Sequence, residues 1–222
     1  MTLSPLPWLL AAASPLEDTW KVLEDGGLFM LAILACSLVG LVVIVLKALM
    51  LSRGRIVPVI LSRKIEALPD PATEGDLEIL RGESAGGDSV LARLCSGVLE
   101  KRGSSAEEVK ESVQSTAREE IVRMSMGLAI LDVILTIGPL LGLLGTASGL
   151  VVVFKDVGAD GNYVALAKGI SRALSTTIAG VAVAVPAVVA HSYFSRKIET
   201  LSARLEVLIG RMVSLSHPSP RD

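Results

Sequence analysis

Residues 133–154 read VILTIGPLLGLLGTASGLVVVF, an uncharged run of about 22 residues that decides the fold. An α-helix needs about 20 apolar residues to cross a hydrocarbon core of about 30 Å, so this run predicts a transmembrane helix. Residues 28–46 and 173–190 form two more uncharged runs, of about 19 and about 18 residues. The pattern therefore predicts an all-α integral membrane protein with three transmembrane helices.

The composition supports this class and excludes others. Of the 222 residues, 51% are hydrophobic, and the mean hydropathy of +0.60 is too high for an ordinary soluble domain. The net charge is −2 and no basic stretch is interleaved with aromatic residues, which excludes a nucleic-acid-binding surface. No P-loop, nucleophile elbow or His-rich ligand set appears, so we expect no enzyme, catalytic residue, metal or cofactor. Cys36 and Cys95 lack the spacing of a disulfide framework or a metal site.

Basic residues indicate on which side of the membrane each flank lies. They follow the first and third uncharged runs and precede the second, which makes these flanks cytoplasmic by the positive-inside rule. The opposite flanks are acidic or short, so the N-terminus is predicted to be periplasmic and the C-terminus cytoplasmic. The basic residues are Lys47, Arg53, Arg55, Arg63, Lys64, Arg118, Arg123, Arg196, Lys197, Arg204 and Arg211.

These assignments divide the chain into seven predicted segments. They are a periplasmic N-terminal segment (1–27), transmembrane helix 1 (28–49), a cytoplasmic helical region (50–125), transmembrane helix 2 (126–155), a periplasmic loop (156–162), transmembrane helix 3 (163–194), and a cytoplasmic C-terminal helix and tail (195–222). Within the first segment, residues 8–14 faintly resemble the end of a signal peptide. The favoured interpretation is a short segment that lies on the membrane surface.

The cytoplasmic helical region is expected to contain one long helix. Ser105 and Glu108 have the spacing of a capping box, in which each side chain bonds the other residue's main-chain amide. Apolar residues recur from there at steps of three or four into transmembrane helix 2, which predicts one helix of about fifty residues. A similar stripe follows transmembrane helix 3. The stripes are Val109, Val113, Ala117, Ile121, Met124 and Leu128, and Ile198, Leu201, Leu205 and Leu208.

Small residues and hydroxyls are concentrated in transmembrane helices 2 and 3. Glycines let helix backbones approach closely, and prolines are tolerated where neighbours satisfy the released carbonyls. Each hydroxyl can bond a carbonyl of its own helix, or the hydroxyls together can line a hydrated path. The packing candidates are Pro139, Gly142, Gly145, Gly149, Gly180 and Pro186, and the candidates for the path are Thr146, Ser148, Ser175, Thr176 and Thr177.

Neither 133–154 nor 173–190 contains Asp, Glu, His, Lys or Arg. A proton path needs a group that titrates, and these runs supply none. If the chain conducts protons, the carboxylate must therefore come from another polypeptide. Asp132, at the cytoplasmic end of transmembrane helix 2, can accept protons that leave the path, but the favoured interpretation is a solvated end residue or a polar contact between subunits.

Residues 138–150, GPLLGLLGTASGL, resemble the second-span motif of ExbB/TolQ proteins, in the ExbB/TolQ/MotA proton-channel family. Residues 169–180, GISRALSTTIAG, and 185–187, VPA, resemble the third-span motif of the same proteins. Thr146 and Thr177 match the pore threonines of the family, and Pro139 and Pro186 match its motif prolines. Residues 26–30 before transmembrane helix 1 extend the likeness weakly.

The resemblance implies a homopentamer in the bacterial inner membrane, with transmembrane helices 2 and 3 around a central pore. The pore would enclose ExbD/TolR-like single-span partners, each of which supplies a transmembrane Asp. Proton-motive force would then be coupled to work at the cell envelope, in some systems through a TonB/TolA-like envelope-spanning protein. The hydroxyls of the pore threonines would solvate the partner's Asp.

Arg172 departs from the family pattern, which has Glu at this position of the third span. If the helix begins near Tyr163, Arg172 lies roughly 14 Å inside it, where an unpaired Arg costs about 2.5–3.5 kcal/mol. One hypothesis is that Arg172 faces the pore and pairs with an acid of the partner or of a neighbouring subunit. The other is that the span begins at Ala173 and that Arg172 lies at the outer interface.

The sequence is also compatible with two alternative functions. Tight small-residue packing is also typical of a non-conducting scaffold that stabilises a partner. A flagellar MotA-like stator is disfavoured because such subunits usually have four spans and three are predicted here. The sequence leaves open whether the motor is TonB-linked, Tol-type or specialised, and whether the ion is H⁺ or Na⁺.

Overall fold

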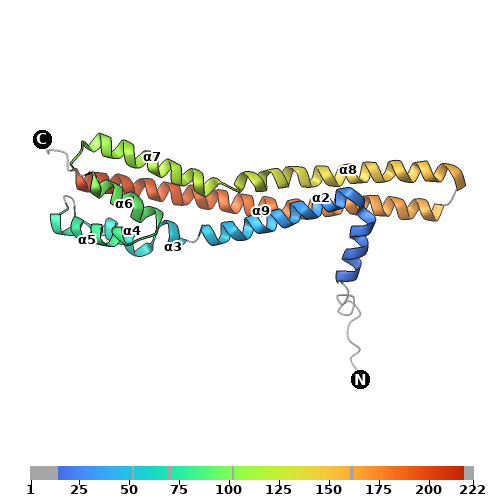
Figure 1. The fold of residues 1–222 in the computed structure, drawn as a ribbon, viewed down its shortest axis with the longest axis horizontal. Helices are drawn as coiled ribbons and strands as arrows, with labels where there is room; N and C mark the ends of the chain where they lie inside the picture. Colours follow the sequence, from blue (N-terminus) through green and yellow to red (C-terminus); the bar gives the residue numbers. More distant parts are fainter. Residues whose placement is uncertain (1–14, 52, 70–71, 102, 161–162, 218–222) are drawn as a thin grey trace, which may run out of the picture. The chain divides into compact units, whose positions relative to one another are not determined.

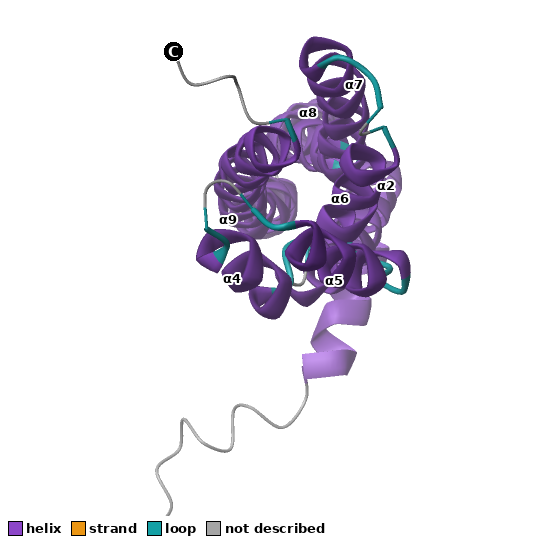
Figure 2. Ribbon diagram, turned by 90° about the vertical axis from the view of Figure 1, so that its left-hand side faces the viewer, coloured by secondary structure: helices purple, strands orange, loops and turns teal. Residues whose placement is uncertain are grey.

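The computed structural model describes residues 15–51, 53–69, 72–101, 103–160 and 163–217. The described residues fold into helices joined by loops, without strands (Figures 1 and 2). The helices are α2 (Pro15–Met50), α3 (Arg53–Ile56), α4 (Val59–Ala67), α5 (Glu74–Ala85), α6 (Val90–Glu100), α7 (Ala106–Ser125), α8 (Leu128–Asp160) and α9 (Tyr163–Ser216). The signal-like residues 8–14 lie outside the described part of the chain.

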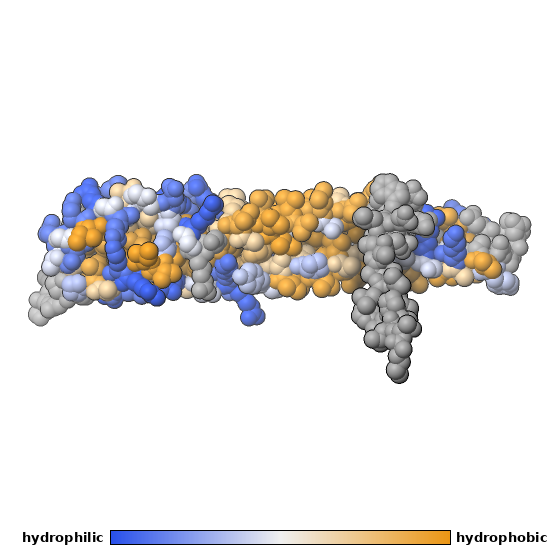
Figure 3. Space-filling model, turned by 90° about the horizontal axis from the view of Figure 1, so that it is seen from below, coloured by the Kyte–Doolittle hydropathy of each residue, from blue (hydrophilic) through white to orange (hydrophobic). Residues whose placement is uncertain are grey.

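Three helical stretches in the described residues are long and apolar enough to cross a membrane. They lie within Gly27–Met50, Ala106–Lys155 and Leu166–Ser216. Large apolar side chains are exposed along them, for example Leu38 (64% exposed) and Leu143 (61%), and Figure 3 shows a broad apolar surface. Such a surface is stable against lipid or protein and unfavourable in water. The prediction of an all-α membrane protein with three helices able to span is confirmed.

The chain divides into two compact units. The first contains Met1–Val43 and Ile130–Ala190, and so holds most of α2, most of α8 and the first half of α9. The second contains Ile44–Ala129 and His191–Asp222. The apolar spans thus form the core of the first unit, and the more polar helices form the second.

The second unit is a helical bundle with an apolar core. Within it, α6 packs against both α5 and α7. Burial in this core raises the pKa of the Cys95 thiol to about 12, because desolvation disfavours the thiolate. Besides Cys95, the largest fully buried side chains of the unit are Leu51, Ile65, Leu77, Leu91, Leu94, Val98, Val109, Leu205, Leu208 and Met212.

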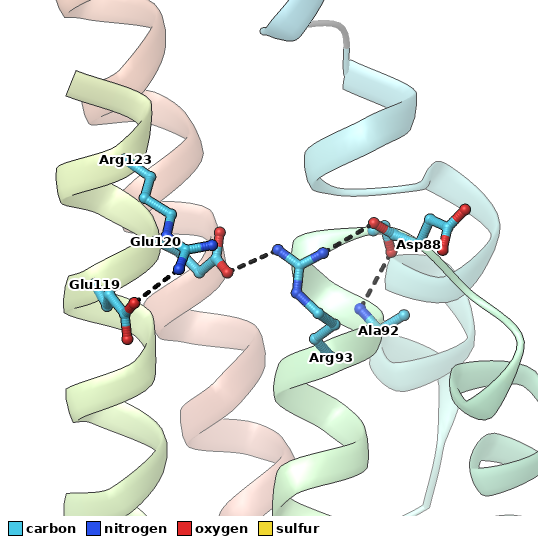
Figure 4. Close-up of polar contacts among 7 residues, drawn as sticks. Asp88, Ala92, Arg93, Glu119, Glu120 and Arg123 are labelled. Atoms are coloured by element: carbon cyan, nitrogen blue, oxygen red, sulfur yellow. Dashed lines mark hydrogen bonds and ion pairs between the residues drawn. The ribbon is translucent and has the colours of Figure 1, made fainter. Parts of the chain in front are cut away.

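Polar contacts tie α6 to the elements around it. Nη2 of Arg93 lies 2.7 Å from Oε1 of Glu120 in α7, and Nη1 donates to the carbonyl of Asp88 at 3.1 Å (Figure 4). Within α7, Arg123 pairs with Glu119 at 2.9 Å. Exposed pairs of this kind contribute about 0–1 kcal/mol each, so the apolar core provides most of the stability of the bundle.

Two arginines hold the last part of α9 to the segment around α4. Nη2 of Arg211 donates to the carbonyl of Leu68 at 2.8 Å. Nη2 of Arg204 lies 3.5 Å from both Oε1 of Glu66 and Oγ of Ser62. The C-terminal half of α9 is therefore an integral part of the second unit.

The predicted capping box at the start of α7 is confirmed. The amide of Glu108 donates to Oγ of Ser105 at 3.3 Å, and the amide of Ser105 donates to Oε2 of Glu108 at 3.4 Å. A second capping box, which the sequence analysis did not identify, joins Thr73 and Asp76 at the start of α5. These contacts satisfy amides that have no partner inside a helix.

The expectation of one unbroken helix of about fifty residues is wrong. α7 ends at Ser125 and α8 begins at Leu128. Gly127 between them has φ = 87°, a backbone conformation that interrupts a right-handed helix and that glycine adopts without steric cost. The apolar stripe continues across the break, which is why periodicity alone did not reveal it.

Candidate functional site

Three threonine hydroxyls meet where α8 and α9 cross in the first unit. Oγ1 of Thr146 in α8 lies 3.0 Å from the carbonyl of Gly142 and 3.0 Å from the carbonyl of Ala173. It also forms a hydrogen bond with Oγ1 of Thr177 and lies 3.4 Å from Oγ1 of Thr176. We call Thr146, Thr176 and Thr177 the threonine cluster.

The carbonyl of Gly142 is the acceptor that the cluster shares. Oγ1 of Thr176 lies 3.2 Å from it and Oγ1 of Thr177 lies 3.1 Å from it. Thr176 also bonds the carbonyl of Ala173 at 2.8 Å. Because each hydroxyl has one proton and several acceptors in reach, the protons of the cluster can be arranged in more than one way. Hydroxyls so placed can both donate and accept.

Glycines set the short distance between α8 and α9. A β-carbon on Gly142 would lie 2.9 Å from the Thr176 carbonyl oxygen and 2.9 Å from the Thr177 α-carbon. A β-carbon on Gly180 would lie 2.5 Å from the Gly138 carbonyl oxygen. Contacts under 3.0 Å force the backbone apart, so only glycine permits this crossing.

Other glycines of the two motifs are close to neighbours as well. A β-carbon on Gly145 would lie 2.8 Å from Oγ1 of Thr176, and one on Gly149 would lie 3.0 Å from the β-carbon of Ala173. The motif prolines stand inside helices that continue through them, Pro139 half-buried in α8 and Pro186 exposed in α9. The structure thus brings the motif glycines of both spans into one helix crossing around the threonine cluster.

α2 contacts α8 on a flank other than that of Thr146, and Gly145 on this flank also lies close to Thr176 of the cluster. A β-carbon on Gly40 would lie 3.4 Å from Cδ1 of Ile134, and one on Gly145 would lie 3.3 Å from the Phe29 β-carbon. At about 100° per residue, Ile134 and Gly145 lie about 120° and about 100° around α8 from Thr146. Thr146 is 9% exposed and Thr177 is half-buried, so the side that carries their shared hydrogen bond stays partly open.

The other predicted path residues do not join the cluster. Ser148 is exposed and lies about 160° around α8 from Thr146. Ser175 bonds the carbonyl of Ser171 in its own helix at 3.0 Å and lies about 160° from Thr177. Arg172 is exposed and lies about 140° from Thr177. Of the six residues predicted to line the path, three lie together in the threonine cluster. A pore-facing position of Ser148, Ser175 and Arg172 stays a prediction.

Some contacts of the site could not be read from the sequence. The carbonyls of Gly142 and Ala173 are main-chain groups, and only helix packing shows that they are acceptors for hydroxyls of the facing helix. In the described residues, no group of three or more His, Cys, Asp or Glu side chains is placed to hold a metal ion. The chemistry of the site is thus that of hydroxyls and carbonyls.

The fold and the cluster define a class, a multi-span α-helical membrane protein in which two glycine-rich spans enclose hydrogen-bonded hydroxyls. Residues 86–207 match the model of the MotA/TolQ/ExbB proton channel family, and the chain belongs to this family.

Named relatives agree with this assignment. The chain is 31% identical over 134 residues to an ExbB homolog of Methanothermobacter thermautotrophicus, a match that covers 60% of this chain and 48% of the relative. It is 38% identical over 87 residues to the biopolymer transport protein ExbB of Helicobacter pylori, covering 38% of this chain and 60% of the relative. It is 40% identical over 92 residues to the biopolymer transport protein exbB1 of Vibrio cholerae, covering 40% of each. The matched part spans about half the length of these relatives.

Proposed function

We propose that this chain is the proton-conducting stator subunit of an ExbB/TolQ-type rotary motor. It forms a homopentamer in the bacterial inner membrane, with its N-terminus periplasmic and its C-terminus cytoplasmic. The ring surrounds the transmembrane helices of ExbD/TolR-like partners and couples proton-motive force to work at the cell envelope, in some systems through a TonB/TolA-like protein. The observation that carries this proposal is the threonine cluster, which places three hydroxyls inside the runs 133–154 and 173–190, where no side chain titrates.

The chemistry of the cluster fits a proton-carrying partner. A carboxyl group in hydrocarbon is strongly biased toward its neutral form, which prevents it from releasing a proton. A hydroxyl can donate to a carboxylate and accept from a carboxylic acid, so it stabilises both protonation states. Thr146, which bonds Thr177, lies about 100° or more around α8 from Gly145 and Ile134, where α2 contacts this helix, so a partner helix can approach on the side of Thr146.

The distribution of charge supports the proposed orientation. Arg55, Arg63, Arg123, Arg196 and Arg204 all belong to the second unit and have exposed side chains. Basic residues beside a span are retained on the cytoplasmic side. The second unit is accordingly assigned to the cytoplasm, and the turn between α8 and α9 to the periplasm.

A non-conducting scaffold is the second candidate, and one observation favours it. Every hydroxyl of the threonine cluster already has a hydrogen-bond partner within the chain. A purely structural link between α8 and α9 would need the same contacts. The two functions differ in whether the hydroxyls of the cluster also form hydrogen bonds with a carboxylate of another polypeptide.

Reconstitution distinguishes these functions. The chain is coexpressed with a single-span partner that carries a transmembrane Asp, and proton uptake is measured in liposomes under a membrane potential. A channel gives uptake with the intact partner and none with the partner's Asp changed to Asn. A scaffold gives no uptake in either case, although the partner is stabilised. Liposomes with the chain alone serve as the control for leakage.

A further inference from the structure

Asp132 lies on the same side of α8 as the threonine cluster. From Asp132 to Thr146 is fourteen residues, which corresponds to about 21 Å along the helix and a rotation of only about 40°. Ile134, which packs against Gly40 of α2, lies about 160° around the helix from Asp132. Asp132 is therefore on the flank of α8 that faces away from α2, and its side chain is exposed.

Asp132 is also isolated from other charges of its unit. The remaining ionisable side chains that are described in the first unit, apart from the thiol of Cys36, are Lys155, Tyr163, Lys168 and Arg172. Lys155, Tyr163 and Lys168 lie toward the turn between α8 and α9, and Arg172 precedes Ala173, whose carbonyl bonds Thr146 of the threonine cluster. Lys155 is 23 residues away along α8, about 34 Å. The carboxylate of Asp132 makes no ion pair with a described residue.

Thr136 provides a hydroxyl between Asp132 and the cluster. Its Oγ1 donates to the carbonyl of Asp132 at 3.0 Å, and its side chain is exposed. It lies one helical turn from Asp132 and about 80° around α8 from Thr146. This flank of α8 thus has hydroxyls at two levels and a carboxylate at the inner end.

We propose that Asp132 is the inner acceptor of the proton path, the group that takes protons from water on the side of the threonine cluster and releases them to the cytoplasm. The inference rests on the proposed function. A hydronium ion or a hydrogen-bonded water transfers its proton to the carboxylate, and the resulting carboxylic acid loses the same proton to water on the cytoplasmic side. The carboxylate is regenerated, so neither an oxidant nor any other reactant is needed.

The experiment measures proton flux in liposomes that contain the chain and its Asp-bearing partner. Asp132→Asn removes the acceptor, whereas Asp132→Glu keeps it. Glu111→Gln is the matched control, because it removes one carboxylate at an exposed position of α7 in the second unit. Formate, a small weak acid, is added on the cytoplasmic side to carry protons in place of the missing side chain. Assembly of each variant with the partner is checked by size-exclusion chromatography.

The proposal predicts that Asp132→Asn lowers flux about tenfold or more, that Asp132→Glu keeps clearly more flux than Asp132→Asn, and that formate restores flux to Asp132→Asn. Glu111→Gln stays within about twofold of the unchanged protein. Unchanged flux in Asp132→Asn would overturn it. A loss that formate does not relieve would overturn it as well, because that loss is structural. If the unchanged complex conducts no protons, the proposed function itself has failed, which is a separate and recognisable result.

Discussion

Nζ of Lys47, in α2, donates a hydrogen bond of 2.7 Å to the carbonyl oxygen of Met124, 77 residues later in the last turn of α7. The Lys47 side chain is only 5% exposed. Carbonyls at the end of a helix have no partner within it, and a cation there also interacts favourably with the helix dipole. Lys47 therefore ties the end of α2 to the point where α7 ends before Gly127.

Lys47→Met is expected to destabilise the second unit by about 1.5–3 kcal/mol. The reason is that a buried hydrogen bond from a charged donor is lost and the Met124 carbonyl is left without that donor. The measurement is thermal unfolding of the purified protein in detergent. Lys64→Met is the matched control, because Lys64 is half-exposed and its ion pair with Glu83 contributes about 1 kcal/mol at most. Equal losses of stability in the two variants would show that the Lys47–Met124 hydrogen bond contributes no more than an exposed ion pair.

Gly142→Ala is expected to separate α8 from α9 and to lower stability by several kcal/mol, because the added β-carbon meets backbone atoms of Thr176 and Thr177 at 2.9 Å. Gly210→Ala in the same chain is the control. Nothing lies within 4 Å of a β-carbon there, so the change removes a helix-weakening glycine and raises stability by about 0.5–1 kcal/mol. Opposite signs in thermal unfolding are predicted, and a tolerated Gly142→Ala would contradict the close crossing.

The buried thiol of Cys95 is expected to make the folded protein less stable at alkaline pH. Burial raises the pKa of its thiol from 9.0 to about 12, so the folded state favours the neutral thiol. This contribution is complete below pH 9.0, the pKa of the unfolded thiol, and is lost progressively as the pH rises toward about 12. Unfolding temperatures are compared for the unchanged protein and Cys95→Ala from pH 8 upward. The unchanged protein should show the steeper decline, and parallel curves would refute the assignment.

The span architecture could be predicted because its causes are local. The uncharged runs around Gly142 and Thr177 are long enough to cross a bilayer in any packing arrangement. The capping box at Ser105 depends on residues three apart, and it forms as predicted. Such features need no knowledge of how distant parts of the chain meet.

The break at Gly127 and the membership of the cluster could not be predicted in the same way. A glycine is tolerated inside a helix, and the sequence does not reveal that Gly127 adopts a positive φ. Composition groups Ser148 and Ser175 with the threonines, whereas helix rotation places Ser148 about 160° from Thr146 and Ser175 about 160° from Thr177. The sharing of the Gly142 carbonyl depends on contact of Gly142 with Thr176 and Thr177, which come 34 and 35 residues later in the chain.

The most direct test of the account is proton uptake by liposomes that contain the chain with its Asp-bearing partner, measured for the Thr146→Val/Thr177→Val double variant. Valine keeps the shape of threonine and removes the hydroxyl. Losing one or two hydrogen bonds to a charged carboxylate, about 1.5–3 kcal/mol each, should lower uptake by about tenfold or more. Ser37→Ala, which removes a hydroxyl from α2, should leave it unchanged. Normal proton uptake by an assembled double variant would contradict the claim that the hydroxyls of these threonines assist proton transfer by the partner's Asp.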